Sequence, residues 1–239
     1  MELPEGGERT GSAVAAVAVL ADDLRRGMYE FIRRARRPVG RDEAAAAVGI
    51  SRKLAAFHLD KLVDAGLLCA RFEPVGGIRK VGRTPKVYEP ADTHIGVSIP
   101  PRRPDLLADV LLDAVLTEGE QETAAEAAMR TARERGHRLG TEERDRSRPG
   151  RLGAERTLTK AEDTLAGYGF EPDRETPTCV RLRNCPFHPL TAKSPELVCG
   201  LNHAFLRGFL AGLQARSVEA VLEPRPGECC VTLRTPPEP

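Results

Sequence analysis

The stretch from residue 41 to residue 86 places the tightest limits on how this chain can fold. Its first part, RDEAAAAV (41–48), is typical of a short helix, and it stops at Gly49, the residue type that a left-handed turn accommodates most easily. Ile50 can fill the corner of that turn, and the hydroxyl of Ser51 can accept hydrogen bonds from the free amides of a second helix. The sequence therefore predicts two short helices joined by a tight turn.

The second helix has two unlike sides. Small or apolar residues and one histidine recur on one side of this helix at a spacing of 3.6 residues: Leu54, Ala55, His58, Leu59, Leu62, Val63 and Gly66. We expect His58 to belong to this buried side. A helix, a glycine turn and a capped second helix with a basic start form the helix-turn-helix pattern, which places the start of the second helix in the major groove of DNA. The side chains expected to contact DNA from this helix are Arg52, Lys53, Ala56, Phe57 and Lys61.

Two β-prone runs follow, LLCARFEP (67–74) and KVYEP (86–90), and a glycine-rich loop joins them. This pattern predicts a hairpin, or wing, that contacts phosphate or the minor groove through Arg79, Lys80, Arg83 and Lys86. Residues 51–90 hold eight Lys and Arg against four Asp and Glu, a modest excess that favours DNA binding by a dimer. Cys69 is expected to be a small buried residue. The alternative is a small α+β module whose hairpin is merely charged.

The composition excludes several classes of function. The net charge is only +1, and aromatic residues make up 4% of the chain, too few for a platform that stacks single-stranded nucleic acid. No apolar run reaches the length of a membrane span, and the acidic N-terminus has the wrong charge order for a signal peptide. We therefore expect a cytoplasmic protein with no membrane partner.

The fold class expected from these patterns is α+β, in four parts. They are a disordered tail (1–12), a winged helix-turn-helix domain (13–92), a linker with a helical dimerisation segment (93–153), and a small C-terminal α+β sensor domain (154–239). Residues 14–37 should form one helix that braces the helix-turn-helix. The helices expected over 105–116 and 120–139 form either a dimer arm or a layer that packs on their own domain.

Five of the six cysteines lie between residues 179 and 230. In a cytoplasmic chain such clustering indicates a metal or redox centre rather than structural disulfides. Three predicted elements deliver thiols: the end of a strand over 178–185, a helix over 194–213 and a strand over 229–235. The ligands expected are Cys185, Cys199, Cys229 and Cys230. Because neighbouring residues of a strand point to opposite faces, one of the last two should face the site, and Cys230 is the better candidate.

Two histidines stand near these cysteines. His188 follows Cys185 with the spacing C-x2-H and is the better candidate for a fourth ligand. His203 follows Cys199 with the spacing C-x3-H and is equally well explained as a partly exposed residue of the helix. With histidine the set suits zinc, and without it the thiolates suit an iron–sulfur cluster. Cys179 is too far along its strand to take part. The remaining alternative is that all five are buried or spare thiols.

Two segments resemble a known family of bacterial regulators. The run SRKLAAFHLDKLVDAGLL followed by GRTPKVY resembles the winged-helix domain of ArsR/DeoR-like repressors, and the pattern NCPFH…ELVCGLNHAFLRGFLAGL…CC resembles the cysteine-bearing domain of SufR-type iron–sulfur repressors. The resemblance implies a dimer that represses cluster-assembly genes while three cysteines hold an iron–sulfur cluster. Those cysteines would be Cys185, Cys199 and one of Cys229 and Cys230. The paired cysteine and His203 depart from the family pattern.

The function expected is a homodimeric transcription regulator, most simply a repressor, that binds a palindromic operator in double-stranded DNA. Its C-terminal cysteines would hold an iron–sulfur cluster or a metal as a sensor. One alternative is the same regulator with a structural zinc or no metal, responding to a small molecule or a partner. An enzyme with a fused DNA-binding domain is the remote alternative, because the chain has no phosphate-binding glycine loop and no catalytic triad or carboxylate pair. We therefore expect no enzyme activity.

Overall fold

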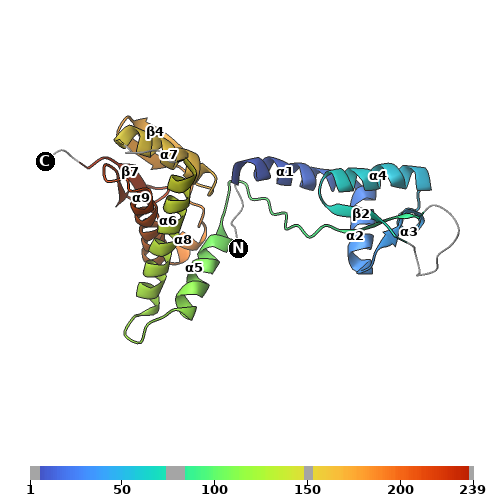
Figure 1. The fold of residues 1–239 in the computed structure, drawn as a ribbon, viewed down its shortest axis with the longest axis horizontal. Coiled ribbons are helices and arrows are strands. Elements are labelled where there is room, and N and C mark those ends of the chain that lie inside the picture. The colour runs from blue at the N-terminus through green and yellow to red at the C-terminus, as the bar shows by residue number, and fades with distance from the viewer. Residues whose placement is uncertain (1–5, 74–83, 148–152, 237–239) are drawn as a thin grey trace. The chain divides into compact units, whose positions relative to one another are not determined.

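The computed structural model describes residues 6–73, 84–147 and 153–236. They combine helices with two small antiparallel sheets (Figure 1). The chain divides into two compact units, one over Gly7–Val97 and one that holds Ser98–Pro239. In these described ranges, no helix has both the length and the apolar character that crossing a membrane requires.

The N-terminal unit builds its core where helices meet one face of a sheet with the strand order β1-β3-β2. Met28, Ile32, Leu59 and Tyr88 are fully buried in that core. The elements described are α1 (Gly6–Val19), α2 (Asp23–Ala35), β1 (Val39–Gly40), α3 (Arg41–Ala47), α4 (Arg52–Asp64), β2 (Leu68–Phe72) and β3 (Lys86–Pro90).

The start of the chain differs from the sequence prediction. Residues 6–12, which we expected in a disordered tail, belong to α1, and the helix expected over 14–37 is broken between α1 and α2. At the break between α1 and α2, a local hydrogen bond caps the end of each helix. The carboxylate of Asp22 accepts the backbone N–H of Arg25 at 2.9 Å, and the Arg25 side chain donates to the Val19 carbonyl at 2.6 Å. Each helix end thus has a partner, so two helices replace one.

The two helices and the turn predicted after residue 41 are present. Gly49 has a φ of +69°, and the hydroxyl of Ser51 accepts the backbone N–H of Leu54 at 3.3 Å. His58 is buried, as predicted, with its Nδ1 3.9 Å from Asp22. Cys69, by contrast, is exposed. Its neighbour Leu68 occupies the buried face of β2, and successive side chains of a strand point to opposite faces.

The C-terminal unit packs helices against a sheet with the strand order β4-β5-β7-β6 (Figure 1). Val180 and Leu182 of β5 and Leu233 of β7 face the same core as Phe205 and Phe209 of α9. The elements described are α5 (Pro104–Leu116), α6 (Ala124–Ser147), α7 (Ala154–Ala166), β4 (Pro172–Thr176), β5 (Cys179–Leu182), α8 (Leu190–Lys193), α9 (Pro195–Gly212), β6 (Glu219–Leu222) and β7 (Val231–Arg234).

The helices α5 and α6 are part of this unit, although we expected residues 93–153 to form a segment of their own. The cause is a close crossing of α6 and α9, in which glycines face the opposite backbone. A Cβ atom on Gly140 would lie 2.8 Å from the Leu213 nitrogen, and one on Gly208 would lie 3.0 Å from the His137 nitrogen. Helices that approach so closely share one core, so the boundary expected after residue 153 does not divide the unit.

Candidate thiol centre

Four cysteines meet at one edge of the C-terminal unit. Cys185 lies in the loop after β5, Cys199 lies near the start of α9, and Cys229 and Cys230 come just before β7. The backbone N–H of Cys229 donates to Leu182 at 2.9 Å, which holds the Cys229–Cys230 pair against the end of β5. Cys185, Cys229 and Cys230 are buried, and Cys199 is half-buried.

The four thiols form a chain of sulfur contacts. Each thiol affects the pKa of a neighbour: Cys229 affects Cys185 and Cys230, and Cys230 affects Cys199. The sequence predicted that these elements deliver thiols to one place, and the structure brings them together. Both members of the Cys229–Cys230 pair take part, although we expected one. The pair precedes β7, which begins at Val231, so the alternation of a regular strand does not separate the two side chains.

The contacts shift the pKa values of neighbouring thiols in opposite directions. The hydrogen bond from Cys229, with others from Cys199 and Asn202, lowers the pKa of Cys230 to about 6. Burial raises the pKa of Cys199 to about 12. The pKa of Cys185 is lowered, chiefly by the Cys229 thiol, while the hydrogen bonds that Cys229 donates raise its own pKa. Because Cys229 carries one thiol proton, it serves one of these two acceptors at a time.

Asn202 is a residue of the site that sequence reasoning missed. Its side-chain Nδ2 donates to the Cys229 sulfur at 3.0 Å, it is 1% exposed, and its Oδ1 has no hydrogen-bond partner. Burying an amide whose oxygen has no hydrogen-bond partner costs free energy, and the bond from Nδ2 to the Cys229 sulfur offsets part of that cost. The signal in the sequence was a polar residue three positions after Cys199, on the apolar face of the helix.

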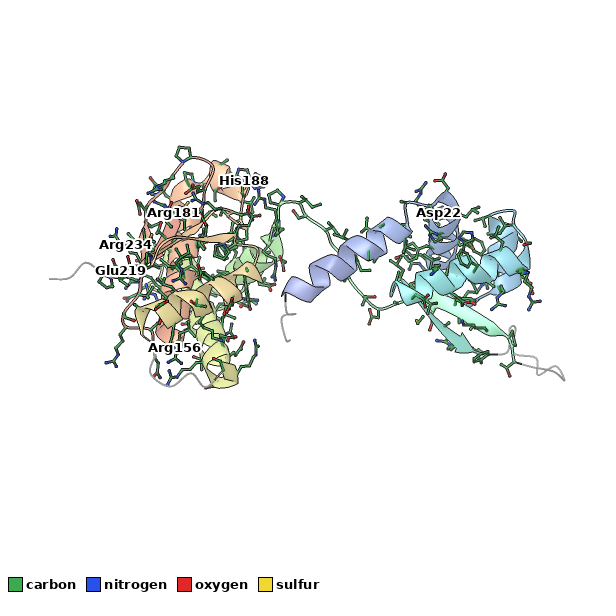
Figure 2. All side chains as sticks on the ribbon, turned by 90° about the horizontal axis from the view of Figure 1, so that it is seen from above. Asp22, Arg156, Arg181, His188, Glu219 and Arg234 are labelled. Atoms are coloured by element: carbon green, nitrogen blue, oxygen red, sulfur yellow. The ribbon has the colours of Figure 1, made fainter. Side chains whose placement is uncertain are left out.

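The two histidines are not part of the sulfur chain. The Nε2 of His203 is 2.9 Å from the carbonyl oxygen of Ala220 in β6, so this ring is held by the sheet. His188 is exposed at the surface of the unit (Figure 2). Cys179 lies at the far end of β5, paired with Arg234, and remains outside the cluster as predicted. In the part of the chain that the structure describes, no three His, Cys, Asp or Glu residues are placed to hold a single metal ion.

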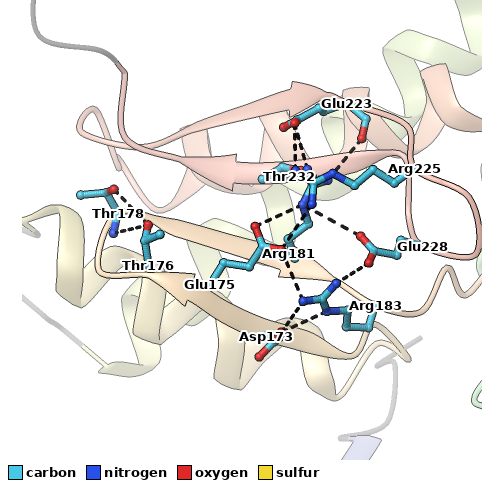
Figure 3. A network of polar contacts seen from close by, with 10 residues as sticks. All are labelled: Asp173, Glu175, Thr176, Thr178, Arg181, Arg183, Glu223, Arg225, Glu228 and Thr232. Atoms are coloured by element: carbon cyan, nitrogen blue, oxygen red, sulfur yellow. Dashed lines mark hydrogen bonds and ion pairs between the residues drawn. The ribbon is translucent and has the colours of Figure 1, made fainter.

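A buried arginine supports the turn that carries Cys229 and Cys230. Arg181 is 1% exposed, and its guanidinium lies 2.9 Å from the carboxylate of Glu223 and 2.9 Å from the hydroxyl of Thr232 (Figure 3). Glu228, beside Cys229, lies 4.0 Å from Arg181 and also contacts Arg183. Arg181 and Arg183 thus hold both ends of the turn from Glu223 to Glu228, and this restrains the backbone that carries Cys229 and Cys230.

The residues expected to bind DNA lie on the exposed side of α4. Arg52, Lys53, Phe57 and Lys61 are exposed, and Ala56 is half-buried between them. The ammonium of Lys61 lies 5.9 Å from the centre of the Phe57 ring, while β3 brings Lys86 to 2.8 Å from Asp60 on the same helix.

Two of these cations are paired with carboxylates that sequence reasoning did not assign to them: Arg52 lies 3.2 Å from Asp42, and Lys86 is paired with Asp60. The predicted wing residues Arg79, Lys80 and Arg83 lie outside the described residues. The two candidate sites are thus a group of thiols in the C-terminal unit and an exposed, partly paired basic side of α4 in the N-terminal unit. No protein-family model and no curated protein sequence matches this chain.

Proposed function

We propose that this protein is a cytoplasmic, homodimeric transcription repressor whose cysteine centre binds an iron–sulfur cluster as its sensor. The observation that carries the proposal is the convergence of Cys185, Cys199, Cys229 and Cys230 from three separate elements. Four thiols rarely meet inside a small unit without a chemical purpose, because each buried sulfur could be replaced by a less reactive apolar residue.

The placement of the thiols favours a cluster over a single zinc ion. Every group in the chain of contacts is a thiol, and sulfur-only sets suit iron–sulfur clusters as well as zinc. The histidines that would favour zinc are absent from it, since His203 is held by Ala220 and His188 is exposed. A cluster contains several irons, so its ligands need not surround a single point. A bound cluster would supply a group whose stability depends on oxidants and on iron supply.

The protein residues have separate roles in this proposal. Cys185, Cys199 and Cys230 would be the ligands, and Asn202 would hold Cys229 beside them through the bond to its sulfur. The low pKa of Cys230 keeps a thiolate ready at neutral pH. The Arg181 network would hold the turn in place while ligands bind.

The N-terminal unit would bind the palindromic operator. The exposed start of α4 offers Arg52 and Lys53 to phosphate or guanine, and Phe57, which is 56% exposed, can contact a thymine methyl. Pairing with Asp42 weakens the positive field at Arg52, so one unit alone would bind weakly and two are needed. The exposed side of α5, with Leu112, Val115 and Leu116, supports dimer formation.

The cluster is tested by purification without oxygen, followed by a visible spectrum and analysis of iron, sulfide and zinc. We expect a coloured protein with iron and sulfide, and Cys185→Ala should lose the colour. Cys69→Ala is the matched control, because this thiol is exposed in the other unit and should leave the colour intact. A colourless protein with one zinc per chain would establish the alternative, a regulator with a structural zinc.

DNA binding is tested by selecting duplexes from a random pool and measuring their affinity across salt concentrations. Lys53→Ala should weaken binding to all selected sequences and reduce the salt slope by about one. Lys193→Ala, on α8 of the other unit, is the control and should leave both unchanged. A selection that enriches no sequence would refute the proposal that this protein is a regulator that binds an operator.

A further inference from the structure

The segment between the two units is held at both ends. On the N-terminal side, the Thr93 hydroxyl donates to the Gly66 carbonyl at 3.1 Å, and Ile95 packs against the core. On the C-terminal side, Pro101, Arg102 and Arg103 are bound to the loop that carries Cys185. Residues 96–100 lie between these attachments, where Ile99 is 86% exposed.

The C-terminal attachment consists of four hydrogen bonds between two short segments, which we name the clasp (101–103 with 184–186). The Arg102 guanidinium donates to the carbonyl of Cys185 at 2.9 Å and also contacts the side-chain oxygen of Asn184. The backbone N–H of Arg103 donates to the Pro186 carbonyl at 2.8 Å. In return, the Asn184 amide donates to the Pro101 carbonyl at 2.8 Å.

The clasp is built into the thiol site. Asn184 is 6% exposed, and its amide also donates to the Gly169 carbonyl at 2.6 Å, which ties it to the loop before β4. Cys185 therefore has two tasks: its sulfur contacts Cys229, and its carbonyl oxygen accepts a bond from Arg102. A backbone movement of Cys185 that displaces its sulfur also displaces its carbonyl, and therefore alters the bond to Arg102.

We propose that the clasp carries the state of the thiol site to the DNA-binding unit, with Arg102 and Asn184 as its positioning residues. This inference rests on the proposed function. When the Cys185 loop shifts, its carbonyl leaves Arg102, and residues 101–103 are released into the connecting segment. The clasp is thus a two-state element at which the sensor and the linker meet.

Release changes the reach of the DNA-binding unit. With the clasp closed, the free connection is residues 96–100, which span at most about 18 Å when extended. With it open, residues 96–103 are free and span at most about 29 Å. The half-sites of an operator lie about 34 Å apart. A short connecting segment restricts the half-site spacing that the two DNA-binding units of a dimer can reach, and a longer segment removes that restriction. The closed clasp therefore favours one operator.

The first test measures the affinity for the selected operator with and without reconstitution by iron and sulfide. We expect the two affinities to differ between about fivefold and 150-fold in the unaltered protein. In Arg102→Ala the difference should shrink to about twofold or less, while iron and sulfide content stay unchanged. Arg103→Ala is the matched control, because its backbone N–H makes the clasp bond and its side chain pairs with Asp105 instead. An unchanged difference in Arg102→Ala would overturn the proposal.

The second test does not depend on a cluster. Amide hydrogen exchange at Arg103, whose backbone N–H donates to the Pro186 carbonyl, is measured before and after N-ethylmaleimide modifies the thiols, and we expect faster exchange after modification. Exchange that stays slow would overturn the clasp. If the protein is colourless but its exchange still becomes faster after modification, the proposed iron–sulfur cluster is refuted and the proposed clasp is not. If Arg102→Ala does not fold, Asn184→Ala is used instead, because it removes the bonds of Asn184 to Arg102 and Pro101. The difference between the two operator affinities must then shrink in the same way.

Discussion

A single methyl group at the crossing of α6 and α9 should destabilise the C-terminal unit and disturb its thiols. In Gly140→Ala the new Cβ would lie 2.8 Å from the Leu213 nitrogen and closer still to the Phe209 carbonyl oxygen. Carbon–oxygen contacts between helices are normally about 3.3–3.6 Å, so the two backbones must separate by on the order of 1 Å. Backbone atoms cannot rotate away as a flexible side chain can.

The magnitude follows from two opposing terms. Overpacking of a dense core costs about 1–3 kcal/mol and occasionally more, and this case is at the upper end because both neighbours are backbone. Alanine is a better helix former than glycine by about 1 kcal/mol, which offsets part of that cost. We expect the free energy of unfolding to fall by about 2 kcal/mol. Since α9 also carries Cys199 and Asn202, iron content should fall with it.

The assay is urea denaturation followed by circular dichroism, with hydrogen exchange to assign the transition to the C-terminal unit. Gly200→Ala is the matched control on α9. Its Cβ would meet the methyl end of Met129, a flexible side chain that can turn aside, so its effect should stay within about 1 kcal/mol. If Gly140→Ala unfolds at the same urea concentration as Gly200→Ala, the close crossing is not what joins α6 to this unit.

Three further outcomes are expected. Arg181→Leu leaves three carboxylates without their buried cation and should lower the free energy of unfolding by about 2–3 kcal/mol, whereas Arg234→Leu, at a half-buried residue, should cost under 1 kcal/mol; equal losses in urea denaturation would contradict the role of the network. The pKa of Cys230 is about 6 against an ordinary 9, so its contribution to stability is full above pH 9 and is lost as the pH falls through 6. The metal-free protein should therefore exceed Cys230→Ser in stability more at ~pH 8 than at ~pH 5 in urea denaturation, and a pH-independent gap would rule this out. Asp60→Asn releases Lys86 for phosphate and should tighten operator binding severalfold with a steeper salt slope, measured by fluorescence anisotropy; weaker binding would place Lys86 off the DNA.

The features that the sequence predicted correctly depend on near neighbours in the chain. The turn at Gly49 and the cap at Ser51 are local, because a left-handed glycine and a hydroxyl three residues before a free amide need no distant partner. The burial of His58 followed from helical periodicity alone. Where a local signal was overlooked, as with the Asp22 cap, the break between two helices was missed as well.

The thiol site was predicted as a set of residues but not as an arrangement. Spacing showed that three elements carry cysteines, and it could not show that both Cys229 and Cys230 contact other thiols or that His203 is bound by Ala220. Those contacts join residues from different strands and helices. Asn202 belongs to the same class, because its partner is 27 residues away.

The sequence by itself determined the local elements and the supply of sulfur, since capping, turn formation and periodicity act within a few residues. Only the tertiary structure decided which unit α6 belongs to, which thiols affect the pKa of one another, and that Arg102 holds the carbonyl of Cys185. These outcomes depend on how closely backbones can approach and on which donors meet which acceptors when the core closes. No pattern along the chain contains that information.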